Sequence, residues 1–203
     1  MIHILIPFIL MIGGSTETGP QGPSQPAEGP GGQVYVCEDI RFSDFARRAD
    51  GYWLFEPEQT ATDCAPVIAF HHGYGAINPM IYGAWIKHLV RQGYIVVYPR
   101  YQKNLLFPGS KAFVGNAASA ILAALERLQT EEGRVRPDTS AFFVAGHSYG
   151  GAVAAHLAAR YRTLGLPHPN GALLCAPGTG PLKGGLLADY SGIDAATHLG
   201  VIV

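Results

Sequence analysis

The amino-acid sequence predicts an α/β fold in which helices cover both faces of a mostly parallel sheet. Two observations carry this prediction. Several short runs are apolar throughout and rich in β-branched or aromatic residues, as expected of strands that are buried on both faces. These runs alternate with longer segments whose apolar residues recur at helical spacing, and such alternation is typical of strand–helix–strand units.

The predicted elements extend from residue 34 to the end of the chain. Strands are predicted, in chain order, at Val34–Cys37, Tyr52–Phe55, Val67–Phe70, Tyr94–Tyr98, Ala141–Ala145, Gly171–Cys175 and Leu199–Val203. Helices are predicted at Met80–Gln92, Lys111–Glu131 and Gly151–Tyr161, and Gly93 suits the end of the first one. Because crossovers between parallel strands are right-handed, these helices should divide between the two faces of the sheet.

The composition fits one folded domain and excludes several kinds of protein. Of 203 residues, 48% are apolar and 14% charged, which is too apolar for a disordered chain. The formal net charge of −1 leaves no electrostatic footprint for nucleic acid. No Cys/His cluster is present, so neither a metal site nor a cofactor is predicted. Cys175 is expected in the core, and Cys37 and Cys64 would pair only in an exported protein.

Two segments are predicted ahead of the domain. Residues 1–12 form an apolar run that is shorter than the about 20 residues a membrane-spanning helix needs, so no stable membrane span is expected. The length fits a signal peptide, which favours a secreted or periplasmic protein. No Lys or Arg precedes the run, so a cytoplasmic protein with an N-terminal extension stays the alternative. Residues 13–32 are predicted to be a Gly/Pro-rich linker, and residues 33–203 the folded domain.

The motif Gly146-His147-Ser148-Tyr149-Gly150 indicates a nucleophilic serine. It lies directly between a predicted strand and a predicted helix, which is the context that makes the G-x-S-x-G pattern informative. A chain that reverses so sharply has no room for side chains at Gly146 and Gly150. We therefore expect Ser148 at the carboxyl end of the sheet, with the backbone N–H of Tyr149 directed at a developing oxyanion.

The loop after the third predicted strand, His72-Gly73-Tyr74-Gly75-Ala76, is the second candidate part of an active site. An oxyanion hole needs a second backbone donor, and its small residues let the backbone approach a substrate. We assign this donor to the N–H of Tyr74, with Gly75 as the close alternative and a plain glycine turn as the non-functional one. His72 is expected to bond to the loop backbone.

These residues resemble the α/β-hydrolase superfamily, and within it the cutinase or polyester-hydrolase and dienelactone-hydrolase-like branch. The resemblance is carried by Phe70–Gly75, Tyr94–Pro99 and Asp138–Gly151, and extends over about residues 33–203. It departs from the cutinase branch at Tyr149, where that branch carries Met. The resemblance implies an α/β-hydrolase fold, here expected to be incomplete at the C-terminus.

The resemblance also implies a catalytic acid and then a histidine, in that chain order, after the serine. It places both beyond the strand that starts near Leu199, so the 203-residue chain alone is expected to be inactive. The pair Asp194 and His198 has the required order and is the alternative within this chain. His147 is expected to face away from the substrate, and His156 to be a packed or capped histidine.

The predicted function is that of a serine hydrolase acting on small-molecule or polymeric carboxylic esters through a Ser148 acyl-enzyme. Two alternatives stay open. The first is a non-catalytic fragment or pseudo-enzyme that keeps the pocket without the base. The second is a serine peptidase or thioesterase on the same fold.

Overall fold

The structure, a computed structural model, describes residues 24–29, 31–58, 63–106, 109–178 and 185–203. It forms two compact units, residues 1–34 and 35–203. In the first unit, the N–H of Gln33 closes a turn by donating to the Pro26 carbonyl at 2.9 Å. The predicted apolar segment 1–12 and most of the predicted linker 13–32 lie outside the described residues. All helices and strands found in the described residues belong to the second unit.

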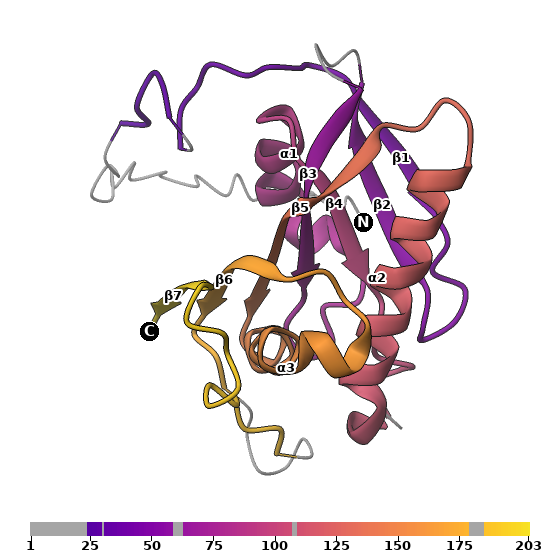
Figure 1. Cartoon of the computed structure of the whole chain (residues 1–203), viewed down its shortest axis with the longest axis vertical. Helices are drawn as coiled ribbons and strands as arrows, with labels where there is room; N and C mark the ends of the chain where they lie inside the picture. Colours follow the sequence, from indigo (N-terminus) through magenta and orange to yellow (C-terminus); the bar gives the residue numbers. More distant parts are fainter. Residues whose placement is uncertain (1–23, 30, 59–62, 107–108, 179–184) are drawn as a thin grey trace, which may run out of the picture. The chain divides into compact units, whose positions relative to one another are not determined.

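In the part of the chain that the structure describes, seven strands form one sheet in the order β1-β2-β4-β3-β5-β6-β7 (Figure 1). The strands are β1 Ile40–Asp44, β2 Tyr52–Pro57, β3 Cys64–His71, β4 Ile95–Pro99, β5 Arg136–His147, β6 Pro169–Cys175 and β7 His198–Ile202. The helices are η1 Pro79–Tyr82, α1 Gly83–Arg91, η2 Ser110–Ala112, α2 Phe113–Thr130 and α3 Tyr149–Leu164. β1, β2 and β4 pair antiparallel, and every other pair is parallel.

The order of the strands reverses at β3. From β3 the chain crosses through α1 to β4 on one side, and then through α2 to β5 on the other side. Right-handed crossovers in opposite directions place α1 and α2 on opposite faces, as Figure 1 shows. β3 and β5 are neighbours in the sheet, and the loops that follow them lead to opposite faces. The place where two neighbouring loops separate in this way is a topological switch point, and ligands bind at such points in open α/β sheets.

Each face of the sheet has its own hydrophobic core. Strand β4 contributes to both, because successive side chains of a strand point to opposite faces. Ile95 and Val97 belong to the core under α2 and α3, whereas Val96 and Tyr98 belong to the core under α1. The apolar runs of the sequence are thus strands that are covered on both sides. The predicted fold, a mostly parallel sheet with helices on both faces, is confirmed.

The prediction of a strand at Val34–Cys37 is wrong. The N–H groups of Val36 and Cys37 both donate to the carbonyl of Arg91 near the end of α1, at 3.0 and 3.3 Å, rather than to a strand. The first strand in the described residues is instead β1, a short strand without a continuous apolar run. It pairs with β2 alone and is only partly covered.

The predicted helices are present with shifted ends. The first begins as the 3-10 turn η1, because the Asn78 side chain accepts the N–H of Met80 and Pro79 occupies the first position. The second likewise begins with a 3-10 turn, η2. The third, α3, begins at Tyr149, two residues before its predicted start, and ends at Leu164.

The structure contains no disulfide between any two of Cys37, Cys64 and Cys175, all of which lie in its described residues. Cys37 is buried and donates to the carbonyl of Val90 at 3.3 Å, and burial raises the pKa of this thiol. Cys64 is exposed, so the Cys37–Cys64 pairing is not formed in the structure. Cys175 is partly rather than fully buried. In the part of the chain that the structure describes, no helix is long and apolar enough to cross a membrane.

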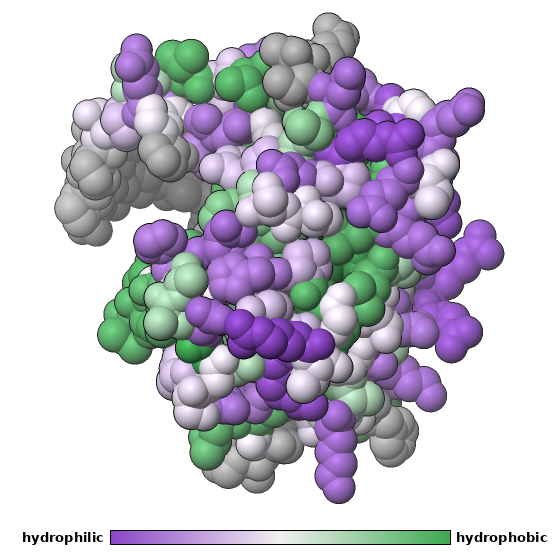
Figure 2. Space-filling view, in the orientation of Figure 1, coloured by the Kyte–Doolittle hydropathy of each residue, from purple (hydrophilic) through white to green (hydrophobic). Residues whose placement is uncertain are grey.

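Within the described residues, strand β7 forms one edge of the sheet and pairs only with β6. Its large apolar side chains are exposed, with 45% of Leu199, 45% of Val201 and 57% of Ile202 accessible. Figure 2 shows hydrophobic residues on the surface where β7 lies in Figure 1. An apolar strand with an open edge is a template for association with another strand.

Candidate active site

Ser148 lies at the sharp turn between β5 and α3. Its backbone has φ 54° and ψ −122°, which places it among three non-glycine residues with positive φ in the described part of the chain. Such a conformation is strained for a residue with a Cβ atom and persists only where its surroundings enforce it. Two backbone bonds do so: Ser148 N–H donates to Cys175 O, and Gly151 N–H donates to Ser148 O, both at 2.9 Å.

The two glycines that flank Ser148 occupy positions where no side chain fits. A Cβ atom at Gly146 would lie 2.1 Å from the carbonyl oxygen of Gly150. A Cβ atom at Gly150 would lie 2.2 Å from the carbonyl oxygen of His71, the last residue of β3. Both neighbours are backbone atoms, which cannot move aside. The spacing of the motif therefore corresponds to a steric requirement of this turn.

The loop after β3 lies beside Ser148. Strands β3 and β5 are in register, with Phe70 opposite Ala145 and His71 opposite Gly146, so both leave the sheet at the same edge. A Cβ atom built on Gly73 would lie 3.4 Å from the Cβ atom of Ser148. The two candidate parts of the active site, remote in sequence, are thus in direct contact.

The candidate oxyanion donors belong to the loop after β3 and to the start of α3. Tyr149 is the first residue of α3, and the first four N–H groups of a helix have no acceptor within it. Of the two alternatives in the loop, the N–H of Gly75 already donates to Gln102 Oε1 at 2.9 Å. The N–H of Tyr74 stays our candidate for the second donor, and the side-chain hydroxyl of Tyr74 donates to the Leu105 carbonyl at 3.1 Å.

His72 bonds to the backbone, as expected. Its Nδ1 lies 2.7 Å from the Gly73 carbonyl oxygen and its Nε2 lies 2.9 Å from that of Arg100. The ring is fully buried and stacks on Tyr101 at a centroid distance of 4.2 Å. Burial lowers the pKa of His72. A neutral imidazole has one N–H, so only one of these two carbonyl groups accepts a hydrogen bond from it, and both ring nitrogens lie against the backbone at the start of the loop.

His147 makes a contact that the sequence did not indicate. Its Nδ1 lies 2.9 Å from the hydroxyl of Tyr82, which also accepts the N–H of Gly73 at 2.9 Å. The side chains of Tyr82 and Gln102 therefore both reach the loop beside Ser148, and sequence analysis missed them. Tyr82 looked like part of a helix, and Gln102 follows a strand without any motif.

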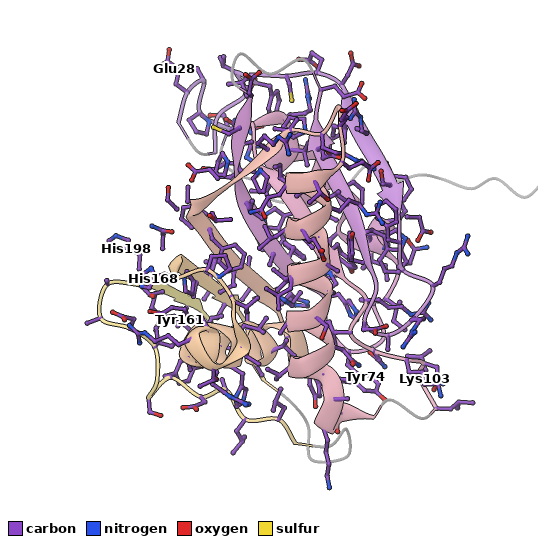
Figure 3. The ribbon with its side chains drawn as sticks, turned by 45° about the vertical axis from the view of Figure 1, so that its right-hand side comes forward. Glu28, Tyr74, Lys103, Tyr161, His168 and His198 are labelled. Carbon is purple, nitrogen blue, oxygen red and sulfur yellow. The ribbon has the colours of Figure 1, made fainter. Side chains whose placement is uncertain are left out.

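The alternative pair of Asp194 and His198 is not formed. Asp194 accepts a bond from Arg162 Nη2 at 2.6 Å. His198 is exposed and pairs in register with Gly171, at the start of β6, whereas the serine contacts Cys175 at the end of that strand. Four residues of strand correspond to about 13 Å along the sheet. In Figure 3, His198 and Tyr74 lie on opposite sides of the domain.

His156 fits its expected role, because its Nε2 lies 2.7 Å from the Leu187 carbonyl oxygen. Within the described residues, then, no histidine held by a carboxylate faces Ser148. Nor do these residues contain a group of three or more His, Cys, Asp or Glu that could hold a metal ion.

The other buried histidine, His71, is strongly perturbed. It is fully buried, its Nδ1 lies 3.0 Å from the Ala145 carbonyl oxygen, and its Nε2 has no hydrogen-bond partner among the residues that the structure describes. Burial disfavours the imidazolium and lowers the pKa of His71 to about 4. The histidine is therefore neutral in the folded protein, with the Nδ1 proton donated to Ala145.

We expect this histidine to destabilise the fold in acid. Its folded pKa lies below its unfolded value of about 6.5, so the unfolded chain binds more protons between these values. The stabilisation is complete above pH 6.5 and is lost as the pH falls towards 4, by about 3 kcal/mol. Urea unfolding at pH 7 and pH 4.5 measures it. His71→Asn, which keeps a donor for Ala145, should reduce the loss, while His198→Asn should not. An equal loss in wild type and His71→Asn would refute this origin.

The sheet order, the strained serine and the adjoining glycine loop define an α/β-hydrolase fold. A family model for chlorophyllase matches residues 47–183, more than half of the chain. The chain therefore belongs to the chlorophyllase family. Its resemblance to the α/β-hydrolases is confirmed, and within them the family that matches is chlorophyllase. No curated protein matches the chain.

Several solved esterases have a similar fold. An inhibited esterase B from Lactobacillus rhamnosis is 16% identical, with a TM-score of 0.53 over 71% of this chain and 51% of that one. Carboxyl esterase 2 from Tuber melanosporum is 21% identical, with a TM-score of 0.53 over 71% and 47% of the two chains. A bacterial heroin esterase is 22% identical, with a TM-score of 0.53 over 68% and 44%. The chain spans about half the length of these proteins.

Proposed function

We propose that the chain supplies the nucleophile and the oxyanion hole of a carboxylic-ester hydrolase. The observation that carries the proposal is the contact between the strained turn at Ser148 and the glycine loop after β3, with the Cβ position of Gly73 3.4 Å from Ser148 Cβ. The chlorophyllase family and the esterase neighbours support the same class of reaction.

In the proposed reaction, Ser148 Oγ attacks the carbonyl carbon of the ester and gives its proton to a general base. The N–H groups of Tyr149 and Tyr74 donate to the oxyanion of the tetrahedral intermediate. The intermediate expels the alcohol, which takes the proton from the base, and leaves Ser148 acylated. Water then attacks the acyl group, releases the acid and restores the serine. This sequence requires neither metal nor cofactor, and it fits small-molecule and polymeric esters alike.

The general base is the part that the described residues do not provide. The histidines near Ser148 are engaged elsewhere: His72 with two carbonyl groups, His71 with Ala145, and His147 with Tyr82. A serine hydroxyl without a base stays protonated and is a weak nucleophile. We therefore expect this 203-residue chain alone to be inactive. The same observation favours the second candidate function, a binding protein that retains the pocket.

Ester hydrolysis tests the proposal. The experiment uses the full-length product of the gene, with any residues that flank this 203-residue chain, and we call it the complete protein. The complete protein and its Ser148→Ala variant are compared with p-nitrophenyl butyrate as substrate. Turnover that depends on Ser148 supports the hydrolase. A complete protein that binds short esters without turning them over supports the binding protein and overturns the hydrolase.

A further inference from the structure

The glycine loop beside Ser148 is held by side chains from three other segments. The N–H of Gly73 donates to Tyr82 Oη at 2.9 Å and the N–H of Gly75 to Gln102 Oε1 at 2.9 Å, while Tyr98 Oη donates to the Ala76 carbonyl at 2.7 Å. Glycines lose the most conformational freedom on folding, so a loop that contains two of them is ordered only by such bonds. The first two bonds hold the backbone N–H groups of the two residues that flank Tyr74.

Tyr82 alone among these three side chains also bonds to the turn that carries the serine, in the contacts that the structure describes. Its hydroxyl lies 2.9 Å from His147 Nδ1, and the two rings meet edge to face at a centroid distance of 5.8 Å. A phenol has one proton. A backbone N–H can only donate, so the Tyr82 oxygen is the acceptor in its bond with Gly73. The phenol proton is therefore available to His147 Nδ1, which leaves the histidine proton on Nε2.

The ring of Tyr82 is fixed by its surroundings. Tyr82 is the last residue of η1, and its ring packs against Phe70 at 5.1 Å and Tyr98 at 6.3 Å. Burial raises the pKa of the Tyr82 phenol, so the hydroxyl keeps its proton at neutral pH. The aromatic rings around Tyr82 thus hold its hydroxyl where it reaches both the loop after β3 and the turn after β5.

We propose that Tyr82 is a positioning residue, whose hydroxyl holds the oxyanion loop at Gly73 and the serine turn at His147 in one arrangement. The proposal rests on the proposed function. Backbone donors stabilise an oxyanion most when they are already in place, because no reorganisation is then needed during the reaction. Tyr82 does not touch the substrate. It acts through the N–H of Tyr74 and the orientation of Ser148.

The test is Tyr82→Phe in the complete protein, which keeps the ring and removes the hydroxyl. We expect kcat for p-nitrophenyl butyrate to fall about 10- to 100-fold with KM changed less than about twofold, since a small misplacement of the catalytic groups slows the chemical step. The matched control is Tyr94→Phe. Tyr94 directly precedes β4, so this change removes a hydroxyl at the amino ends of the strands, and the site lies at their carboxyl ends. Its kcat should stay at the wild-type value. An unchanged kcat in Tyr82→Phe would overturn the proposal.

The link to the serine turn is tested by a double-mutant cycle with His147. His147→Asn keeps an acceptor near the position of Nδ1, whereas His147→Gln moves it away. If Tyr82 acts through both segments, His147→Asn should retain more of kcat than His147→Gln, and the effect of Tyr82→Phe should be smaller in the Gln background. If Tyr82→Phe lowers kcat by the same factor in wild type and in His147→Gln, Tyr82 does not act through His147.

Hydrogen exchange of the loop separates this proposal from the proposed function. In Tyr82→Phe, the amides of residues 73–76 should exchange faster than in wild type, whether or not the protein hydrolyses esters. If the complete wild-type protein does not hydrolyse esters, the proposed hydrolase function is contradicted. The positioning role of Tyr82, here called the tether, would still be tested by the exchange rates. Equal exchange rates in wild type and Tyr82→Phe would refute the tether itself.

Discussion

Ser148→Ala in the complete protein is expected to lower kcat for p-nitrophenyl butyrate by about 10⁶-fold, the size of effect seen when the serine of a catalytic triad is removed. The remaining oxyanion donors and the binding site account for the residual rate over water. KM should change little, because the missing hydroxyl takes part in bond formation rather than in binding. Steady-state kinetics with enzyme purified free of host esterases measures both constants.

The matched control is Ser191→Ala. Ser191 is exposed and its hydroxyl bonds to Asp189 Oδ1 at 2.7 Å, so this change removes a serine hydroxyl from another loop. Its kinetic constants should equal those of wild type. A Ser148→Ala variant that keeps more than about a tenth of the wild-type kcat would show that another group is the nucleophile.

Gly150→Ala should prevent the domain from reaching its native structure. The new Cβ atom would lie 2.2 Å from His71 O and 2.4 Å from His72 O, so either β3 or the start of α3 must move. Overpacking a buried site against side chains costs about 1–3 kcal/mol, and rigid backbone atoms make the cost larger. We expect the free energy of unfolding to fall by more than about 3 kcal/mol. Urea unfolding of the purified variant, or its loss from the soluble fraction, measures this.

Gly115→Ala is the control for the same chemical change. Gly115 lies inside α2, and a Cβ atom there meets nothing within 4 Å. Alanine in a helix interior is more favourable than glycine by about 0.5–1 kcal/mol, so this variant should be slightly more stable than wild type. A Gly150→Ala protein as stable as Gly115→Ala would mean that the turn at Ser148 is not built as described.

Much of the fold could be predicted because the buried strands are visible in the sequence. A strand such as β4 contributes side chains to two cores, so every residue in it is apolar and the run stands out. The turn at Ser148 was equally visible, because its geometry excludes Cβ atoms at two fixed positions. Where packing or sterics restrict the residue type, the sequence is informative.

Other features depend on contacts between remote segments. The run Val34–Cys37 has a strand-like composition, yet its N–H groups bond to Arg91 at the end of α1. β1 was missed because an edge strand that is partly exposed carries polar residues in alternation. Tyr82 and Gln102 reach the glycine loop from other elements. A side chain that bonds to a backbone amide in a remote segment belongs to no sequence motif, so its role could not be predicted from the sequence.

Contacts between the loop after β3 and the turn after β5 would let the two segments act as one site in the proposed reaction. The backbone of Gly150 packs against the carbonyl of His71, and Tyr82 connects Gly73 to His147. A change at one segment is therefore transmitted to the other through short, directional contacts. The proposed attack of Ser148 on an ester carbonyl group therefore requires both segments to be correctly folded.

Covalent labelling of Ser148 tests the central claim most directly. A fluorophosphonate probe is incubated with the complete protein, and the modified residue is identified by mass spectrometry of its peptides. The account predicts a single adduct on Ser148, lost in Ser148→Ala, retained in Ser191→Ala and formed more slowly in Tyr82→Phe. An adduct on another residue, or labelling that persists in Ser148→Ala, would contradict it.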